Sequence, residues 1–216
     1  MIIEEQLRSL GASLGLDSDI IEQISTCRQF AMYPILPASD VATLSFVTSQ
    51  EIANTLPTGH SDLWVLAPSH VDVPYPIRKV AVADPSKVFW SLVHGHNSVS
   101  VQLSPSVIDS TAAIHPTAQV AEQGVEIAAN VSIGPGTVIR PGVRIEKNCT
   151  VGGSCQLGND GFMVKDTFSA RVRISHDAGV KIASGVILGA GVIVDAGLFG
   201  MDTEIAQNTA VDSGVH

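Results

Sequence analysis

The sequence predicts a mainly β protein in which a small α/β domain precedes a parallel β-helix of six-residue repeats. Two observations support this fold class. From Ile127 onward an aliphatic residue recurs at every sixth position, with a small or short residue four places after it. Before residue 97 the chain instead contains short apolar segments with the alternation of β-strands and one segment with the spacing of an α-helix.

The six-residue period excludes a helix as its explanation. Positions six apart lie about 240° apart around an α-helix of 3.6 residues per turn, so they share no face. A short strand followed by a corner explains the pattern, with the aliphatic and small residues inside and Gly, Pro, Asn or Asp at the corner. Three such sides form one triangular coil, and coils stack about 4.8 Å apart with parallel hydrogen bonding. The aliphatic positions of the central run are Ile127, Ile133, Ile139, Ile145, Val151 and Leu157.

The period is interrupted after Phe162 and returns at Ile182. Residues 163–181 contain charged side chains, an aromatic and a histidine, which predicts a loop that leaves the β-helix. Such a loop is a favourable place for a site, because the stacked coils fix its base. Cys149 and Cys155 lie one repeat apart, and we expect them to fill the core rather than to form a metal or redox pair. The sequence predicts no metal site.

Residues 1–96 predict the small α/β domain. Leucines and isoleucines within residues 4–24 favour short helices, and the segments 42–48, 62–68 and 78–84 have the character of strands. Residues 84–95 carry apolar side chains at helical spacing, and Gly95 is the expected end of that helix. Residues 97–107 form a polar linker, so the predicted domains are 1–96 and 108–216.

Composition excludes several classes of partner. The formal charge of −9 argues against nucleic acid or an anionic membrane surface, although local cations such as Arg171, Arg173 and Lys181 can bind a small anion. Three cysteines are too few for a disulfide framework, and the acidic N-terminus is unlike a signal peptide. Without an apolar stretch of about 20 residues, we expect a cytoplasmic protein.

Short motifs occur in a fixed order along nearly the whole chain. In order and spacing they resemble the UDP-3-O-acylglucosamine N-acyltransferases of lipid A biosynthesis, a family of hexapeptide-repeat acyltransferases. The motifs are Leu44-Ser45-Phe46, Val80 to Pro85, Ile114-His115-Pro116-Thr117-Ala118, Gly158-Asn159-Asp160-Gly161-Phe162, Arg173-Ile174-Ser175-His176, Val194-Asp195-Ala196-Gly197 and Val211-Asp212.

The resemblance implies a left-handed β-helix and a homotrimer with active sites between neighbouring β-helices. It also implies N-acyl transfer to a UDP-amino sugar, with an acyl carrier protein or coenzyme A thioester as acyl donor and no other cofactor. Such a transfer needs a base for the sugar amine and hydrogen-bond donors for the oxyanion.

The resemblance also assigns residues to the site. Phe46 stacks on the uracil, while Ser49 and Ile52 stand where the family has asparagine and tyrosine, so we expect weak uridine nucleotide binding. Asp212 matches an aspartate that faces the active-site cleft. His216 matches a position next to the catalytic histidine and lines the acyl or phosphate channel.

The family's catalytic histidine lies just beyond His216, so we do not expect residues 1–216 alone to catalyse acyl transfer at an appreciable rate. Within the sequence, the candidate substitute base is His176, which lies beside Asp177 in the predicted loop of residues 163–181. We expect His115, Asp160 and Asp195 to be corner residues.

Two alternative functions stay open. The chain is a trimeric β-helix that serves binding or assembly without chemistry, or it is a sugar acetyltransferase that uses coenzyme A.

Overall fold

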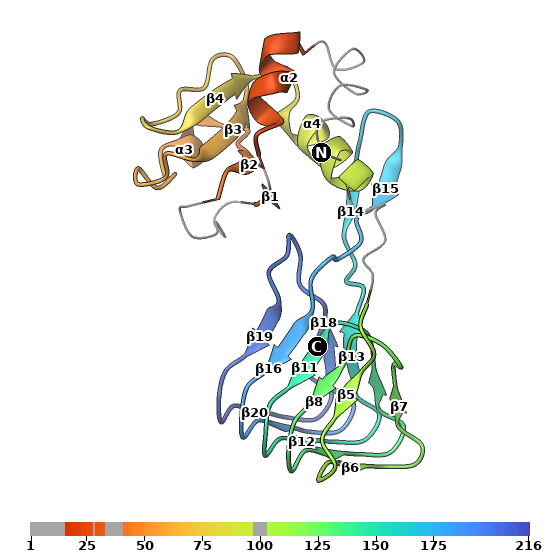
Figure 1. The fold of residues 1–216 in the computed structure, drawn as a ribbon. Helices are drawn as coiled ribbons and strands as arrows, with labels where there is room; N and C mark the ends of the chain where they lie inside the picture. Colours follow the sequence, from red (N-terminus) through yellow and green to blue (C-terminus); the bar gives the residue numbers. More distant parts are fainter. Residues whose placement is uncertain (1–15, 28, 33–40, 97–102) are drawn as a thin grey trace. The chain divides into compact units, whose positions relative to one another are not determined.

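The computed structural model describes residues 16–27, 29–32, 41–96 and 103–216. The chain divides into two compact units. The N-terminal unit consists of Met1–Val99 together with Met163–Ile174, and the β-helix unit consists of Ser100–Phe162 together with Ser175–His216 (Figure 1). The excursion expected from the β-helix is therefore largely part of the N-terminal unit.

A parallel four-stranded sheet forms the centre of the N-terminal unit. Its strands lie in the order β1 (Gln29–Phe30), β2 (Thr43–Phe46), β3 (Leu63–Ala67) and β4 (Arg78–Ala81). Every residue of β3 is buried, as expected for a strand that is covered on both faces of a parallel sheet. The segments predicted as strands contain β2, β3 and β4, whereas β1, with two residues, gives no sequence pattern.

Three helices accompany this sheet in the described residues: α2 (Ser18–Ile24), α3 (Gln50–Ala53) and α4 (Pro85–His96). Helix α4 begins at a proline, which suits the first helical position because its missing N–H has no partner there in any case. It extends one residue past the expected end at Gly95. The helices predicted over residues 4–24 fall mainly outside the described residues.

The second unit is a left-handed parallel β-helix with three sheets. Two of the sheets have five strands and the third has four, each strand comes from a different coil, and all the pairings are parallel. The first contains β5 (Val107–Ile108), β8 (Glu126–Ile127), β11 (Val143–Ile145), β16 (Val180–Ile182) and β19 (Thr203–Ile205). The second contains β6 (Ala113–Ile114), β9 (Ser132–Ile133), β12 (Thr150–Val151), β17 (Ile187–Leu188) and β20 (Ala210–Val211). The third contains β7 (Gln119–Val120), β10 (Val138–Ile139), β13 (Gln156–Asn159) and β18 (Ile193–Asp195).

The repeated aliphatic and small residues form the core of this β-helix. All six aliphatic positions of the central run are buried, as are the small residues Val131, Thr137 and Val143. The thiols of Cys149 and Cys155 are buried, free and donate to the carbonyl oxygens of Ala183 and Gly189, each at 3.1 Å. Both cysteines are therefore core residues.

The excursion between coils is an antiparallel hairpin of β14 (Val164–Asp166) and β15 (Arg171–Arg173). It packs on α4, where the Phe168 N–H donates to Ser91 Oγ at 3.3 Å. Parallel pairing resumes at Val180, and Ile182 lies opposite Ile145. Sequence reasoning expected a loop over 163–181, because two strands of three residues are too short for a period-two pattern.

No helix in the described part of the chain combines the length and the apolar character that crossing a membrane requires.

Candidate functional site

Phe46 ends strand β2 and lies in an aromatic cluster. Its ring centroid is 4.9 Å from that of Phe89 and 6.2 Å from that of Trp90, both on α4. Phe89 and Trp90 are buried, whereas Phe46 is only half-buried. The cluster therefore holds the Phe46 side chain in place and leaves part of its ring exposed at the carboxyl end of a parallel strand, where sheets of this kind bind ligands.

Ser49 caps helix α3. Its backbone is extended, with φ −144° and ψ 159°, and its hydroxyl oxygen accepts the Ile52 N–H at 3.3 Å. Serine suits this position because its side chain satisfies one of the free N–H groups of the first helical turn. Helix capping thus explains why a serine occurs at position 49. A contact between Ser49 and the substrate stays a prediction. Ile52 is 37% exposed.

His176 lies where the chain returns to the β-helix after the hairpin. Its Nδ1 is 2.6 Å from the carbonyl oxygen of Ala196, and because a carbonyl only accepts, Nδ1 carries the hydrogen. Nε2 is buried and has no hydrogen-bond partner. In this conformation a substrate amine has no access to Nε2, so a role as base requires the ring to move.

Three carboxylates hold the segments around His176 by accepting backbone N–H groups. Asp160 accepts from His176 at 2.8 Å, Asp177 from Gly200 at 3.3 Å, and Asp202 from Gly179 at 2.8 Å. Asp202 also pairs with Arg144. Asp177 is adjacent to His176 in the sequence, but the imidazole bonds to the backbone carbonyl of Ala196. Sequence patterns do not identify a carbonyl partner 20 residues away.

His216 forms a pair with Asp195 that the sequence did not reveal. His216 Nε2 lies 3.5 Å from Asp195 Oδ2, and the Asp195 side chain is the less exposed of the two. Asp212 is exposed, and one of its carboxylate oxygens accepts the Ser213 N–H at 2.7 Å. Asp195, expected as a corner residue, thus lies beside a predicted site residue.

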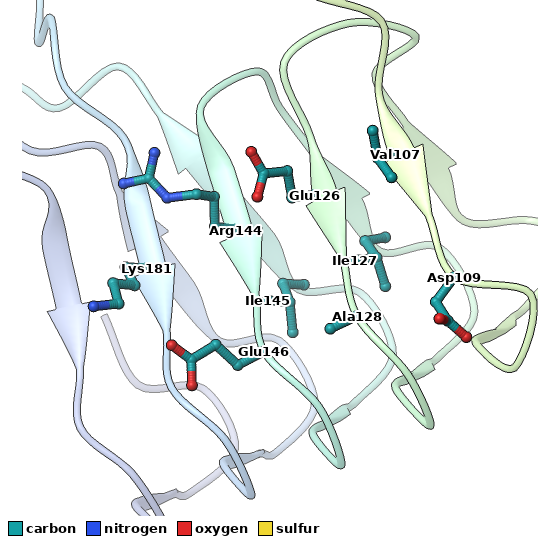
Figure 2. Close-up of a pocket in the computed structure, with 9 residues that line it drawn as sticks. All are labelled: Val107, Asp109, Glu126, Ile127, Ala128, Arg144, Ile145, Glu146 and Lys181. Atoms are coloured by element: carbon teal, nitrogen blue, oxygen red, sulfur yellow. The ribbon is translucent and has the colours of Figure 1, made fainter.

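The outer face of the first β-helix sheet contains a groove of about 560 Å³. Figure 2 shows outward side chains from β5, β8, β11 and β16 along it, with the small Ala128 near its middle. Its lining residues are Val107, Asp109, Glu126, Ile127, Ala128, Arg144, Ile145, Glu146 and Lys181.

Hydrogen bonds keep two carboxyl groups of this groove ionised. The hydroxyl and backbone N–H of Ser184 donate to Glu146 Oε2 and lower the pKa of Glu146. The hydroxyl and N–H of Thr111 lower the pKa of Asp109 in the same way. These carboxylates therefore remain charged at neutral pH.

Two of the cations expected to bind a small anion, Arg171 and Lys181, have separate carboxylate partners. Arg171 Nε is 2.9 Å from Asp166 Oδ1 in the hairpin, and this pair lowers the pKa of Asp166. Lys181 Nζ is 3.9 Å from Glu204 Oε1 in the β-helix. Within the described ranges, no three histidine, cysteine, aspartate or glutamate side chains are placed to hold a metal ion.

Comparisons with known proteins identify the repeat. Residues 124–159 match the family model described as bacterial transferase hexapeptide (six repeats). A search of the curated proteins finds no match.

Among solved structures, the chain is similar to a mutant GDP-perosamine N-acetyl transferase from Caulobacter crescentus in complex with CoA and GDP-perosamine. The two are 16% identical, the match covers 70% of this chain and 75% of that chain, and the TM-score is 0.27. The hexapeptide repeat of bacterial transferases is thus the feature that the chain shares with a described family.

Proposed function

We propose that the protein is an N-acyltransferase of the lipid A type, which transfers an acyl group from a thioester to the amine of a UDP-amino sugar. The observation that carries this proposal is the β-helix itself, whose coils at residues 124–159 match the hexapeptide repeat of bacterial transferases. The order of motifs along the rest of the chain, from Leu44-Ser45-Phe46 to Val211-Asp212, supports the same class.

The N-terminal unit supplies the proposed site for the nucleotide. The half-buried Phe46 ring is held by Phe89 and Trp90, and it offers its exposed area to the uracil. Stacking on an aromatic ring contributes on the order of 1 kcal/mol. Because Ser49 is engaged as a helix cap and Ile52 is apolar, we propose that the uracil is held mainly by stacking and therefore weakly.

The last described coils supply the proposed contacts with the acceptor sugar and the acyl chain. The His216 ring lies beside the Asp195 carboxylate, and Asp212, which follows β20, is exposed. An imidazole and a carboxylate can both form hydrogen bonds with polar groups of a substrate.

The test is an acyl-transfer assay on the natural gene product that contains residues 1–216, beside residues 1–216 alone, for which we expect no appreciable rate. A UDP-amino sugar with a free amine is supplied with an acyl-carrier-protein thioester or with acyl-CoA, and release of the free thiol is measured. From the gene product we expect thiol release that requires the amine, with UDP-N-acetylglucosamine, whose amine is blocked, as the matched control. Comparison of the two donors separates the lipid A type from a sugar acetyltransferase that uses coenzyme A.

Absence of amine-dependent release with both donors, from a gene product that circular dichroism shows to be folded, would contradict the proposal. That result would favour the alternative of a β-helix that serves binding or assembly.

A further inference from the structure

We infer that Lys165, on the hairpin inserted into the β-helix, binds the diphosphate of the nucleotide and makes the site prefer nucleoside diphosphates over nucleosides. This inference rests on the proposed function, because it takes a UDP-sugar as the ligand. It extends that function by assigning a specificity-determining residue that the sequence motifs do not contain.

Strand β14 exposes an apolar side chain and partly buries a charged one, which reverses the usual pattern of strands. Val164 is 40% exposed, whereas the next residue, Lys165, is half-buried and lies opposite Val172. The inward position of a hairpin strand ordinarily holds an apolar side chain, and lysine is among the residues least often buried. An aliphatic residue would pack there without loss of hydration, so packing alone does not explain the lysine.

The Lys165 ammonium has capacity to bind an anion. Its Nζ lies over the indole of Trp90, 5.0 Å from the ring centroid. The adjacent carboxylate of Asp166 is paired with Arg171 instead, and no carboxylate of the described residues lies within ion-pair distance of Lys165. An ammonium has three donors, and a ring face engages its charge without using them as conventional hydrogen bonds.

Lys165 and Phe46 lie against the same indole. The Phe46 centroid is 6.2 Å from that of Trp90, and Trp90 is one helical position from Phe89, which contacts Phe46 more closely. Contact with one indole thus connects Phe46 and Lys165, and the inference takes the base to stack on Phe46 and the diphosphate to reach Lys165. Because the protein carries a formal charge of −9, binding a dianionic group requires such a local cation.

The experiment measures by calorimetry the affinities of UDP and of uridine for the whole protein and for Lys165→Met, which keeps the length of the side chain but removes its charge. We expect UDP affinity to fall about tenfold while uridine affinity stays within about twofold, as for loss of one charge-assisted contact. Lys165→Arg keeps the charge and should retain most of the UDP affinity. UDP binding should also weaken with added salt less in Lys165→Met than in the unmodified protein.

Lys79→Met is the matched control, since its ammonium donates to the Ser69 carbonyl oxygen in the same unit. Thermal melts identify a variant that fails to fold, in which case Lys165→Arg and the salt dependence of UDP binding decide. Equal losses of UDP and uridine affinity, or unchanged UDP affinity in Lys165→Met, would overturn the inference while leaving the thiol-release result untouched. A protein that binds neither UDP nor uridine would overturn it as well.

Discussion

His176 and Gly161 fit one another at the root of the hairpin. The His176 imidazole donates to the Ala196 carbonyl, and the His176 backbone N–H donates to Asp160. The imidazole ring lies against the backbone of Gly161. A Cβ atom at residue 161 would come within 2.7 Å of both ring nitrogens, closer than real Cβ contacts. The glycine of the motif Gly158-Asn159-Asp160-Gly161-Phe162 is therefore explained by the space that the histidine needs.

This fit leads to a prediction for Gly161→Ala. The new methyl group displaces the imidazole, and we expect the free energy of unfolding to fall by about 1–3 kcal/mol, as in other overpacked sites. In the double variant Gly161→Ala/His176→Ala the clash is absent, so the two effects should not add. Gly59→Ala is the control, because nothing lies within 4 Å of a Cβ there. Additive losses in denaturant titrations would contradict the role of His176.

At the scale of elements, isoleucines stack in register through the first β-helix sheet. Ile108, Ile127, Ile145 and Ile182 lie opposite one another on successive strands. Ile127, Ile145 and Ile182 are buried, whereas Ile108 is 44% exposed. One side chain thus occurs in equivalent backbone positions at different depths of the core.

The different burial of these isoleucines predicts graded losses of stability when each is replaced by alanine. Ile145→Ala and Ile182→Ala should each lower the free energy of unfolding by about 2–5 kcal/mol, since they leave cavities between coils. Ile108→Ala, at the same hexad position, should cost well under half of that, because its side chain is already partly hydrated. Chemical denaturation of the three variants provides the measurement. An equal loss in the free energy of unfolding for all these variants would show that burial does not control the stability of these coils.

The elements differ in how far the sequence predicts them. The hexad strands follow from the six-residue period, and β2, β3 and β4 follow from apolar segments with turn residues at their ends. The hairpin does not, because its strands have three residues and Lys165 occupies an inward position. Among site residues, Phe46 was identified from its motif, whereas the pairing of His216 with Asp195 and of His176 with the Ala196 carbonyl depends on how distant coils stack.

For the whole molecule, the chain connects the two units more than once. Residues 100–162 belong to the β-helix unit, residues 163–174 to the N-terminal unit, and residues 175–216 to the β-helix unit again. The hairpin that carries Lys165 is thus covalently anchored in the β-helix at both of its ends. A site in the N-terminal unit that uses Lys165 therefore depends on both units in the chain, although its contacts all lie within one.

The last prediction is that the protein is a homotrimer. Ile187 on β17 and Ile193 on β18 are 55% and 36% exposed, although they belong to neighbouring sheets of one β-helix. Association of copies would remove such apolar surface from water, and a stable interface needs about 1,000 Å² or more in total.

Light scattering at micromolar concentration should give three times the 22.6 kDa mass of the chain. Ile187→Glu should lower that mass, because an unpaired carboxylate is costly to bury. Val164→Glu is the control, since Val164 is a similarly exposed aliphatic residue on the hairpin. A stable monomer before any substitution would rule out the trimer.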